Sequence, residues 1–170
     1  MKSSRQVTTS TNCSHRAAVF NRVDIISFLL DHHVPIDTRD AQNSTPFLDA
    51  VAAGQTECAQ LLLQRGADFK TSDIFMKNCI HMAVENEHLE TLHMLLEEKS
   101  IRFNLYSPDV NEMVPLHYAA MVKDVRVGTV LKGSMYTLMC HTSILTDPLL
   151  NREPKFGPIL LQSGLFFDHL

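Results

Sequence analysis

The sequence is short of cysteine and of basic residues. Only four cysteines occur among 170 residues, and none lies at the paired spacing of a disulfide framework, which favours a reducing compartment. The formal net charge is -4. A protein that binds the phosphate backbone of nucleic acid normally carries a clustered basic excess. The composition therefore argues against a disulfide-rich secreted domain and against a nucleic-acid binder.

Long apolar runs are also missing. No stretch approaches the ~18 uninterrupted apolar residues of a membrane-spanning helix, and the apolar segment 157–167 is too short. The first eleven residues contain Lys2, Arg5 and many hydroxyl side chains but no apolar core, so they do not form a secretory signal. Their composition leaves an organelle transit peptide open. We expect residues 1–11 to be a disordered lead-in.

The sequence also lacks the common catalytic motifs. The sequence contains no G-x-S-x-G, no P-loop, no H-E-x-x-H and no C-x-x-C. We therefore predict a protein that is not an enzyme and that holds no cofactor. What is present is ordinary globular composition, with 45% hydrophobic and 20% charged residues, enough for one domain and at most two.

The best-defined pattern lies between Thr45 and Asp68. Thr45 is a good helix N-cap and is followed by Pro46, which is tolerated in a first helical turn. Gly54 permits a sharp reversal, and a second apolar run ends at Gly66, a usual C-terminal stop. The stretch predicts a helix, a tight turn and a second helix.

This pattern recurs along the chain at a period of about 33 residues. At that spacing the position of Leu48 is taken by His15 and His81, and His117 follows three positions late, which implies three extra residues in one loop. The second-helix core recurs at the same interval, at 28–30, 61–63 and 94–96. The cap position is occupied by Asn12, Thr45, Asn78 and Val114. The alternative is an unrelated small helical domain, and the recurrence of three features at one period argues against it.

The repeating residues resemble the ankyrin pattern T-P-L-H-x-A-A…G…L-L-L-x-x-G-A-D. The resemblance implies an all-α ankyrin-repeat solenoid of helix-turn-helix units joined by β-turn fingertips. We expect about three and a half repeats, at 12–39, 40–72, 73–108 and, in part, 109–131.

Several positions depart from the pattern. Asn21, His33 and Asn43 replace glycine but visit left-handed conformations readily. Glu87 and Lys99 also replace glycine, so the turns of the third repeat should be less sharp. The second helix of the last repeat should cover 125–131, but Gly128 interrupts it and the register is lost. Residues 132–170 are then an irregular tail, a failed repeat, or sequence from an alternative transcript end.

A narrower resemblance concerns the segments 45–48, 72–84 and 114–120. Together with the long loop before the last of them, they are similar to middle and late repeats of TRPA-type (transient receptor potential ankyrin) cation channels. The resemblance implies a fragment of the cytoplasmic N-terminal arm of such a channel, without the pore helices, acting as a regulatory scaffold. The alternative is a soluble ankyrin adaptor that binds a protein partner. Both interpretations imply a cytoplasmic location.

Nine histidines invite a metal site, but the spacing argues against one. His15, His81 and His117 occupy the slot where ankyrin histidines usually bond backbone of the neighbouring repeat. Cys13 and Cys79, each two residues before one of these histidines, look like halves of a zinc site but lie two repeats apart in a linear stack. We expect no bound metal. His32, His33, His88 and His93 are expected to be solvated.

Two cysteines could be reactive. Cys13 and Cys79 both fall at the first helical residue, where the helix dipole favours a thiolate, whereas Cys58 lies on a core face. The sensing of electrophiles by TRPA-type channels is compatible with this hypothesis. The alternative is that both are small buried side chains without reactivity.

Binding is expected on the concave side, which fingertip turns and first helices form. The candidate contact residues are Gln42, Asn43, Phe75, Met76, Glu112 and Met113. Apolar side chains on exposed turns suit a protein partner or the remainder of a longer ankyrin array. They could instead cover only the neighbouring turns.

Overall fold

A computed structural model describes residues 13–141 of the chain. The chain divides into two units, Met1–Ser134 and Met135–Leu170. The fold below is that of the first unit, and of the second only the helical residues 135–141 are described.

The described residues are helical and contain no strand, which confirms the all-α fold class. Residues 13–19 form the first helix. The elements that follow are α2 (Val23–Asp31), α3 (Pro46–Ala52), α4 (Thr56–Gln64), α5 (Cys79–Glu85), α6 (Leu89–Glu97), the 3-10 helix η1 (Ile101–Tyr106), α7 (Pro115–Met121) and α8 (Val125–His141). No helix among the described residues has the length and apolarity needed to span a membrane.

The helices keep the period of the sequence. The second helices α2, α4 and α6 begin at Val23, Thr56 and Leu89, at equal intervals along the chain. The first helices α3 and α5 are separated by the same interval, whereas α7 begins three positions later than that interval predicts. The extra residues lie where the long loop was expected, and there the chain forms η1, with Ile101 and Leu105 buried.

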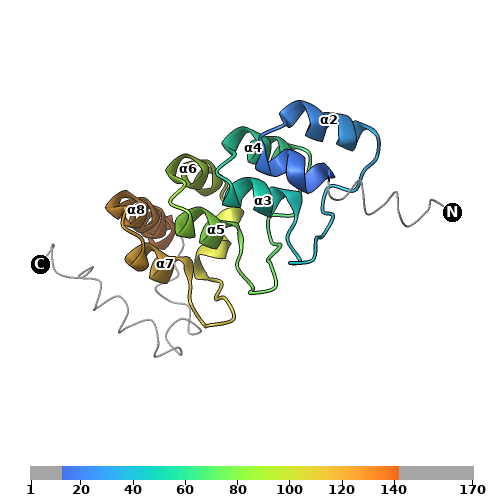
Figure 1. The fold of residues 1–170 in the computed structure, drawn as a ribbon. Helices are drawn as coiled ribbons and strands as arrows, with labels where there is room; N and C mark the ends of the chain where they lie inside the picture. The colour runs from blue at the N-terminus through green and yellow to red at the C-terminus, as the bar shows by residue number, and fades with distance from the viewer. Residues whose placement is uncertain (1–12, 142–170) are drawn as a thin grey trace, which may run out of the picture. The chain divides into compact units, whose positions relative to one another are not determined.

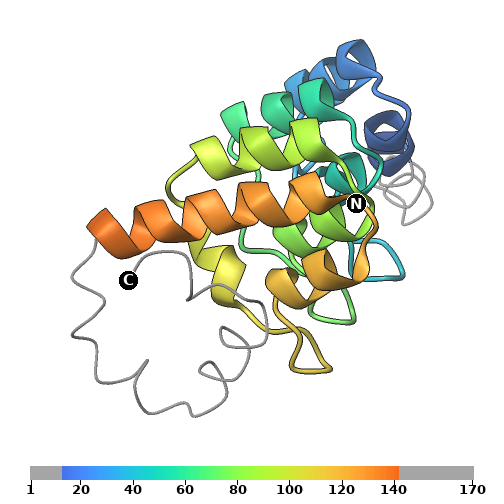
Figure 2. The same cartoon turned by 90° about the vertical axis from the view of Figure 1, so that its left-hand side faces the viewer.

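The helices form two layers (Figures 1 and 2). One layer contains α3, α5 and α7, and the other contains α2, α4, α6 and the beginning of α8. Helix α3 packs on α4 within its pair and on α5 of the next pair, and α5 packs likewise on α6 and α7. In the other layer α4 packs on α2 and on α6. The core between the layers is apolar, and its largest fully buried side chains include Phe47, Leu48, Leu62, Ile80, Leu92 and Leu95.

Side-chain caps begin the first helices α3 and α5, whereas Val114 before α7 makes no such bond. Thr45 Oγ1 accepts the N–H of Leu48, and Pro46 occupies the first turn. Asn78 Oδ1 accepts the N–H groups of Ile80 and His81, at 3.0 and 3.2 Å. These bonds satisfy donors that a helix N-terminus otherwise leaves unpaired, so the caps fix where each helix begins.

The turn between the two helices of a pair has the same geometry three times. Asn21, Gly54 and Glu87 have φ values of 53°, 71° and 58°, in the left-handed region. In each pair the N–H of this residue and of the next one bond carbonyls at the end of the first helix. The expectation of a less sharp turn at Glu87 is therefore wrong. Packing of the helix pair holds this residue in a conformation that glycine would adopt at lower cost.

The expected break at Gly128 and irregular chain from residue 132 are wrong for the residues that α8 covers. This helix runs from Val125 to His141, so Gly128 does not interrupt it and residues 132–141 are helical rather than irregular. A glycine costs a helix only about 1 kcal/mol relative to alanine, and Val127 and Leu131 are fully buried on either side of it. The expectations for residues 1–11 and 142–170 lie outside the described residues.

Candidate protein-interaction surface

Three fingertip turns project from the helix pairs, and an aspartate organises each of them. In Asp40, Asp73 and Asp109, one carboxylate oxygen accepts the backbone N–H groups two and four residues further on, at 2.8–2.9 Å. Such side-chain acceptors replace the bonds that a short turn cannot make with its own backbone. The fourth residue of each turn has φ of 59°; these residues are Asn43, Met76 and Glu112.

Successive fingertips are joined by backbone hydrogen bonds. The N–H of Ile74 donates to the carbonyl of Gln42, and the N–H of Val110 donates to the carbonyl of Phe75, each at 3.0 Å. The Asn43 amide also donates to the carbonyl of Ser72, at 3.1 Å. The three turns therefore form one continuous ribbon rather than three independent loops.

The ribbon carries exposed apolar side chains. Phe75 and Met76, both predicted contact residues, are 52% and 56% exposed. Ile74 and Val110 are exposed to a similar degree, at 52% and 51%, and were not among the predicted residues. They directly follow the turn aspartates Asp73 and Asp109, so aligning the turns would have found them. We call Ile74, Phe75, Met76 and Val110 the fingertip patch.

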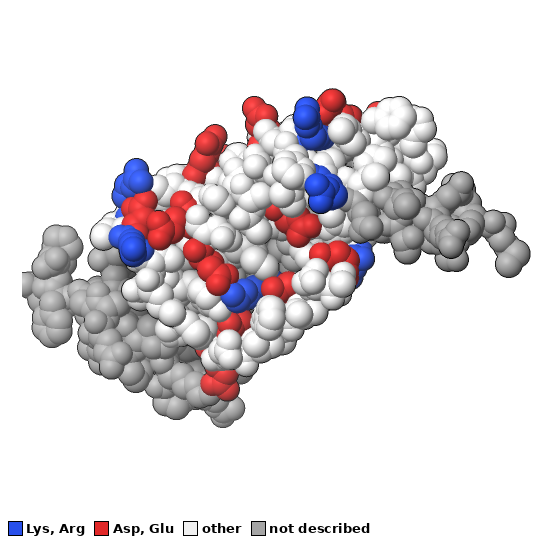
Figure 3. All heavy atoms as spheres, in the orientation of Figure 1, with Lys and Arg blue, Asp and Glu red and all other residues white. Residues whose placement is uncertain are grey.

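The other predicted contact residues border the patch. Gln42, Asn43 and Glu112 are exposed, and Met113 is half-buried. Gln42 and Met113 contribute backbone carbonyls to inter-repeat bonds, so part of their role is structural. In Figure 3 the lower edge of the molecule, where the fingertips lie, is largely uncharged except for acidic atoms at its lowest tip. A row of mostly acidic side chains, with basic ones among them, runs between this edge and the helices.

In the third repeat the periodic histidine, His81, bonds to backbone groups, as predicted. His81 is fully buried; its Nδ1 accepts the N–H of Asn78 and its Nε2 donates to the carbonyl of Met113 in the next repeat. Burial lowers the pKa of His81 below 6.5, so the neutral ring is favoured. His117 makes the first of these bonds, with its Nδ1 accepting the N–H of Val114.

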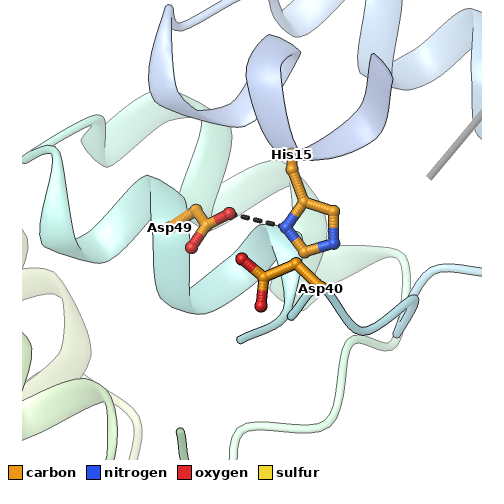
Figure 4. A group of neighbouring side chains, drawn as sticks. All are labelled: His15, Asp40 and Asp49. Carbon is orange, nitrogen blue, oxygen red and sulfur yellow. Dashed lines mark hydrogen bonds and ion pairs between the residues drawn. The ribbon is translucent and has the colours of Figure 1, made fainter. Parts of the chain in front are cut away.

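His15 is bound differently. Its Nδ1 lies 2.6 Å from Asp49 Oδ2 (Figure 4). Its Nε2 lies 3.1 Å from the carbonyl oxygen of Thr38, so both ring nitrogens face acceptors. Burial alone would lower the pKa of His15, but the hydrogen bond and charge of Asp49, with the charge of Asp40, raise it above 6.5. An imidazolium that joins the first repeat to the second is therefore favoured.

His15, Asp40 and Asp49 could offer ligand atoms within 4.8 Å of one another. Their existing bonds account for the cluster without an ion. Asp40 holds its turn as the other two fingertip aspartates do, and Asp49 also accepts the hydroxyl of Ser44, at 2.6 Å. A histidine whose two nitrogens both donate has no lone pair left for a metal.

The two predicted thiols lie in different surroundings. Cys13 is exposed, whereas Cys79 is fully buried, and burial raises the pKa of Cys79 to about 11. The prediction that Cys79 is reactive is therefore wrong, because loss of water outweighs the helix dipole. Burial also raises the pKa of Cys58 to about 11, in agreement with its expected core position. Reactivity of Cys13 stays a prediction.

His88 was expected to be solvated, and this is wrong. It is half-buried, and its Nε2 donates to the carbonyl of Ala52 in the preceding repeat, at 3.1 Å. His32, His33 and His93 are exposed, as expected.

A polar cluster lies beside the fingertip patch. The Tyr118 hydroxyl donates to Asp109 Oδ2 at 2.7 Å, and Lys77, paired with Glu85 at 2.8 Å, lies 4.9 Å above the Tyr118 ring. Burial alone would raise the pKa of Asp109, but the Tyr118 hydroxyl and two backbone N–H groups lower it. The cluster fixes the last fingertip turn on helices α5 and α7.

Comparison with known proteins places this geometry in a family. The family described as ankyrin repeats (many copies) matches residues 14–63 and again residues 47–96. The offset between the two matches equals the interval that separates α3 from α5.

Similar proteins contain such repeats within much longer chains. The E3 ubiquitin-protein ligase KEG of Arabidopsis thaliana is 30% identical over 88% of this chain, which covers 9% of the ligase. Human transient receptor potential cation channel subfamily A member 1 is 27% identical over 62% of this chain and 10% of the channel. Dog inversin is 31% identical over 51% of this chain and 8% of inversin. The chain thus spans about a tenth of each relative.

Ankyrin repeats serve as protein-interaction modules in proteins of otherwise different function, so the relatives agree on the architecture rather than on one activity. The period, the paired helices in two layers, the fingertip turns and the sequence matches all coincide. The chain belongs to the ankyrin-repeat family.

Proposed function

We propose that this chain is a non-catalytic scaffold that binds a protein partner across the fingertip patch. The observation that carries the proposal is four exposed apolar side chains, Ile74, Phe75, Met76 and Val110, on turns tied together by backbone bonds. Met76 occupies a left-handed position that costs a non-glycine residue about 1–3 kcal/mol, yet its side chain is 56% exposed. Such a residue contributes little to its own fold, so contact with a partner is the better reason for it.

The surroundings of the patch suggest the chemistry of the partner. Aspartates organise all three turns, and the groups that line the edge of the helices above them are mostly acidic, with basic ones among them (Figure 3). A partner segment with apolar side chains and flanking lysine or arginine would complement this surface. Its binding should weaken as salt screens the charges.

The test uses the whole chain as bait for crosslinking and mass spectrometry in cells. Phe75→Asp places a charge in the patch and should remove the crosslinked partner. Met121→Asp is the matched control, because Met121 is 72% exposed on α7 outside the patch. Partners that survive Phe75→Asp, or that are lost equally with Met121→Asp, would contradict binding through the fingertips.

For the larger protein, we propose a segment of the cytoplasmic arm of a TRPA-like cation channel, where the repeats regulate ion transport. Similarity to the human and the Drosophila channel, over 62% and 66% of the chain, supports this proposal. The alternative is a soluble adaptor that binds a protein partner. The match to the plant ligase, over 88% of the chain, indicates that similar repeats also occur in proteins that are not named as channels.

Complete transcripts distinguish the two proposals. Further repeats followed by several apolar stretches of ~20 residues in the same reading frame would support the channel. Full-length transcripts that all end without such stretches would contradict it and leave the adaptor, whose partner the crosslinking experiment identifies.

A further inference from the structure

The first helix pair has an exposed apolar face, apart from the fingertip patch. Phe20 and Phe28 are 60% and 59% exposed, Ile25 is 42% exposed, and Val19 is 38% exposed. Val19 ends the first helix, Phe20 follows it in the turn, and Ile25 and Phe28 lie on α2. We call these four residues the α2 face.

The period of the repeats shows what covers this face elsewhere. The position of Ile25 recurs at Cys58 and Thr91, which are 0% and 1% exposed. The position of Phe28 recurs at Leu61 and Met94, which are both half-buried.

In these later repeats a preceding second helix is present. Helix α4 packs on α2, and α6 packs on α4. Among residues 13–141 no helix precedes the first pair, which leaves Ile25 and Phe28 exposed. The positions of Val19 and Phe20 recur at Glu85 and Asn86, which are exposed although a pair precedes them, so the comparison rests on Ile25 and Phe28.

The α2 face lacks the composition of a terminal cap. Capping repeats need a polar outer face to remain soluble. Here the Arg16 guanidinium lies 5.3 Å from the centre of the Phe20 ring, and the His32 ring lies 4.0 Å from that of Phe28. Each polar group covers only one side of its ring, and both rings remain more than half exposed.

We propose that the α2 face stacks against one further ankyrin-type helix pair, which a longer form of this polypeptide supplies ahead of the present repeats. The face continues the interface already formed between α2 and α4. A pair such as α3 and α4 runs from Pro46 to Gln64, which is longer than the twelve residues before the first described helix. Met1 and Val7 are the only large apolar residues among those twelve.

The experiment adds such a pair in register. A second copy of residues 40–72, which contain α3 and α4, is inserted between Gln6 and Val7 of the full chain. Because Val7 precedes Asp40 by one full repeat, the insertion keeps the period and places the new second helix over α2. Thermal unfolding should remain one transition, and its Tm should rise by about 5 °C or more.

Two variants make the result specific. Ile25→Glu/Phe28→Glu should change the Tm of the original chain by less than about 2 °C, because exposed positions tolerate substitution, but should abolish the rise caused by the insertion. Met121→Glu/Val125→Glu, at positions 72% and 79% exposed, is the matched control and should preserve the rise.

Two results would overturn the proposal. One is an inserted pair that unfolds in a separate transition and leaves the original Tm unchanged. The other is a dimer of the unmodified chain in sedimentation analysis that Phe28→Glu dissociates, because the occupant of the face would then be a second copy of this chain.

Discussion

Gly54→Ala should destabilise the chain through two separate effects at one turn. Gly54 has φ of 71°, and a left-handed conformation costs a residue with a Cβ roughly 1–2 kcal/mol. A Cβ there would also lie 2.7 Å from Nδ1 of the His88 ring, which is shorter than a van der Waals contact allows. The ring would have to move and would lose its bond to the carbonyl of Ala52, worth about 1 kcal/mol. The expected total is about 2–3 kcal/mol of unfolding free energy.

Gly66 provides the matched control. Its φ is 90°, but a Cβ there meets nothing within 4 Å. Gly66→Ala should therefore lower the unfolding free energy only by the cost of the left-handed backbone, roughly 1–2 kcal/mol. Urea unfolding followed by circular dichroism measures both free energies. In a His88→Ala background the Gly54→Ala cost should fall to the Gly66→Ala value. A Gly54→Ala cost no larger than that of Gly66→Ala would refute the proposed contact between the two repeats.

Three further outcomes are expected. The folded-state pKa of His15 is raised above 6.5, so its ion pair stabilises the folded state fully below about pH 6.5 and less as the pH rises through the raised pKa. In urea unfolding, His15→Leu should therefore lower the unfolding free energy more at pH 6 than at pH 8. Equal losses at the two pH values would contradict the ion pair. Iodoacetamide should label Cys13 rapidly in the folded chain and Cys79 only on unfolding, as peptide mass spectrometry would show; equal labelling would disprove the burial of Cys79. Tyr118→Phe removes a hydrogen bond to the Asp109 carboxylate and should cost about 1–2 kcal/mol in urea unfolding, whereas an unchanged stability would exclude a structural role for the bond.

The architecture could be predicted because it follows from local signals repeated at a fixed spacing. Caps such as Thr45 and Asn78 and the apolar triplets of the second helices mark each pair, and the structure confirms the helices they predict. The turn at Glu87 could not be predicted, because propensity disfavours its left-handed conformation and only packing of the helix pair imposes it. Helix α8 was missed for a similar reason, since burial of Val127 and Leu131 outweighs the glycine between them.

The candidate surface was predicted only in part. The exposure of Phe75 and Met76 follows from their place in a turn, which the sequence shows. The contribution of Val110 depends on its backbone bond to Phe75, a contact between the turns of two successive repeats. Such contacts are fixed by stacking, and a single sequence does not display them.

The sequence by itself determined the repeat, its period of about 33 residues and the helical character of each unit, because these depend on caps, turns and apolar spacing over short stretches of chain. The tertiary structure decided the fate of individual side chains. It made His15 an ion-pair partner and His81 a neutral backbone ligand although both occupy one slot of the repeat, and it buried Cys79 while leaving Cys13 exposed. The physical reason is that burial and charge depend on the neighbouring repeat, whose residues lie a full period away in the chain.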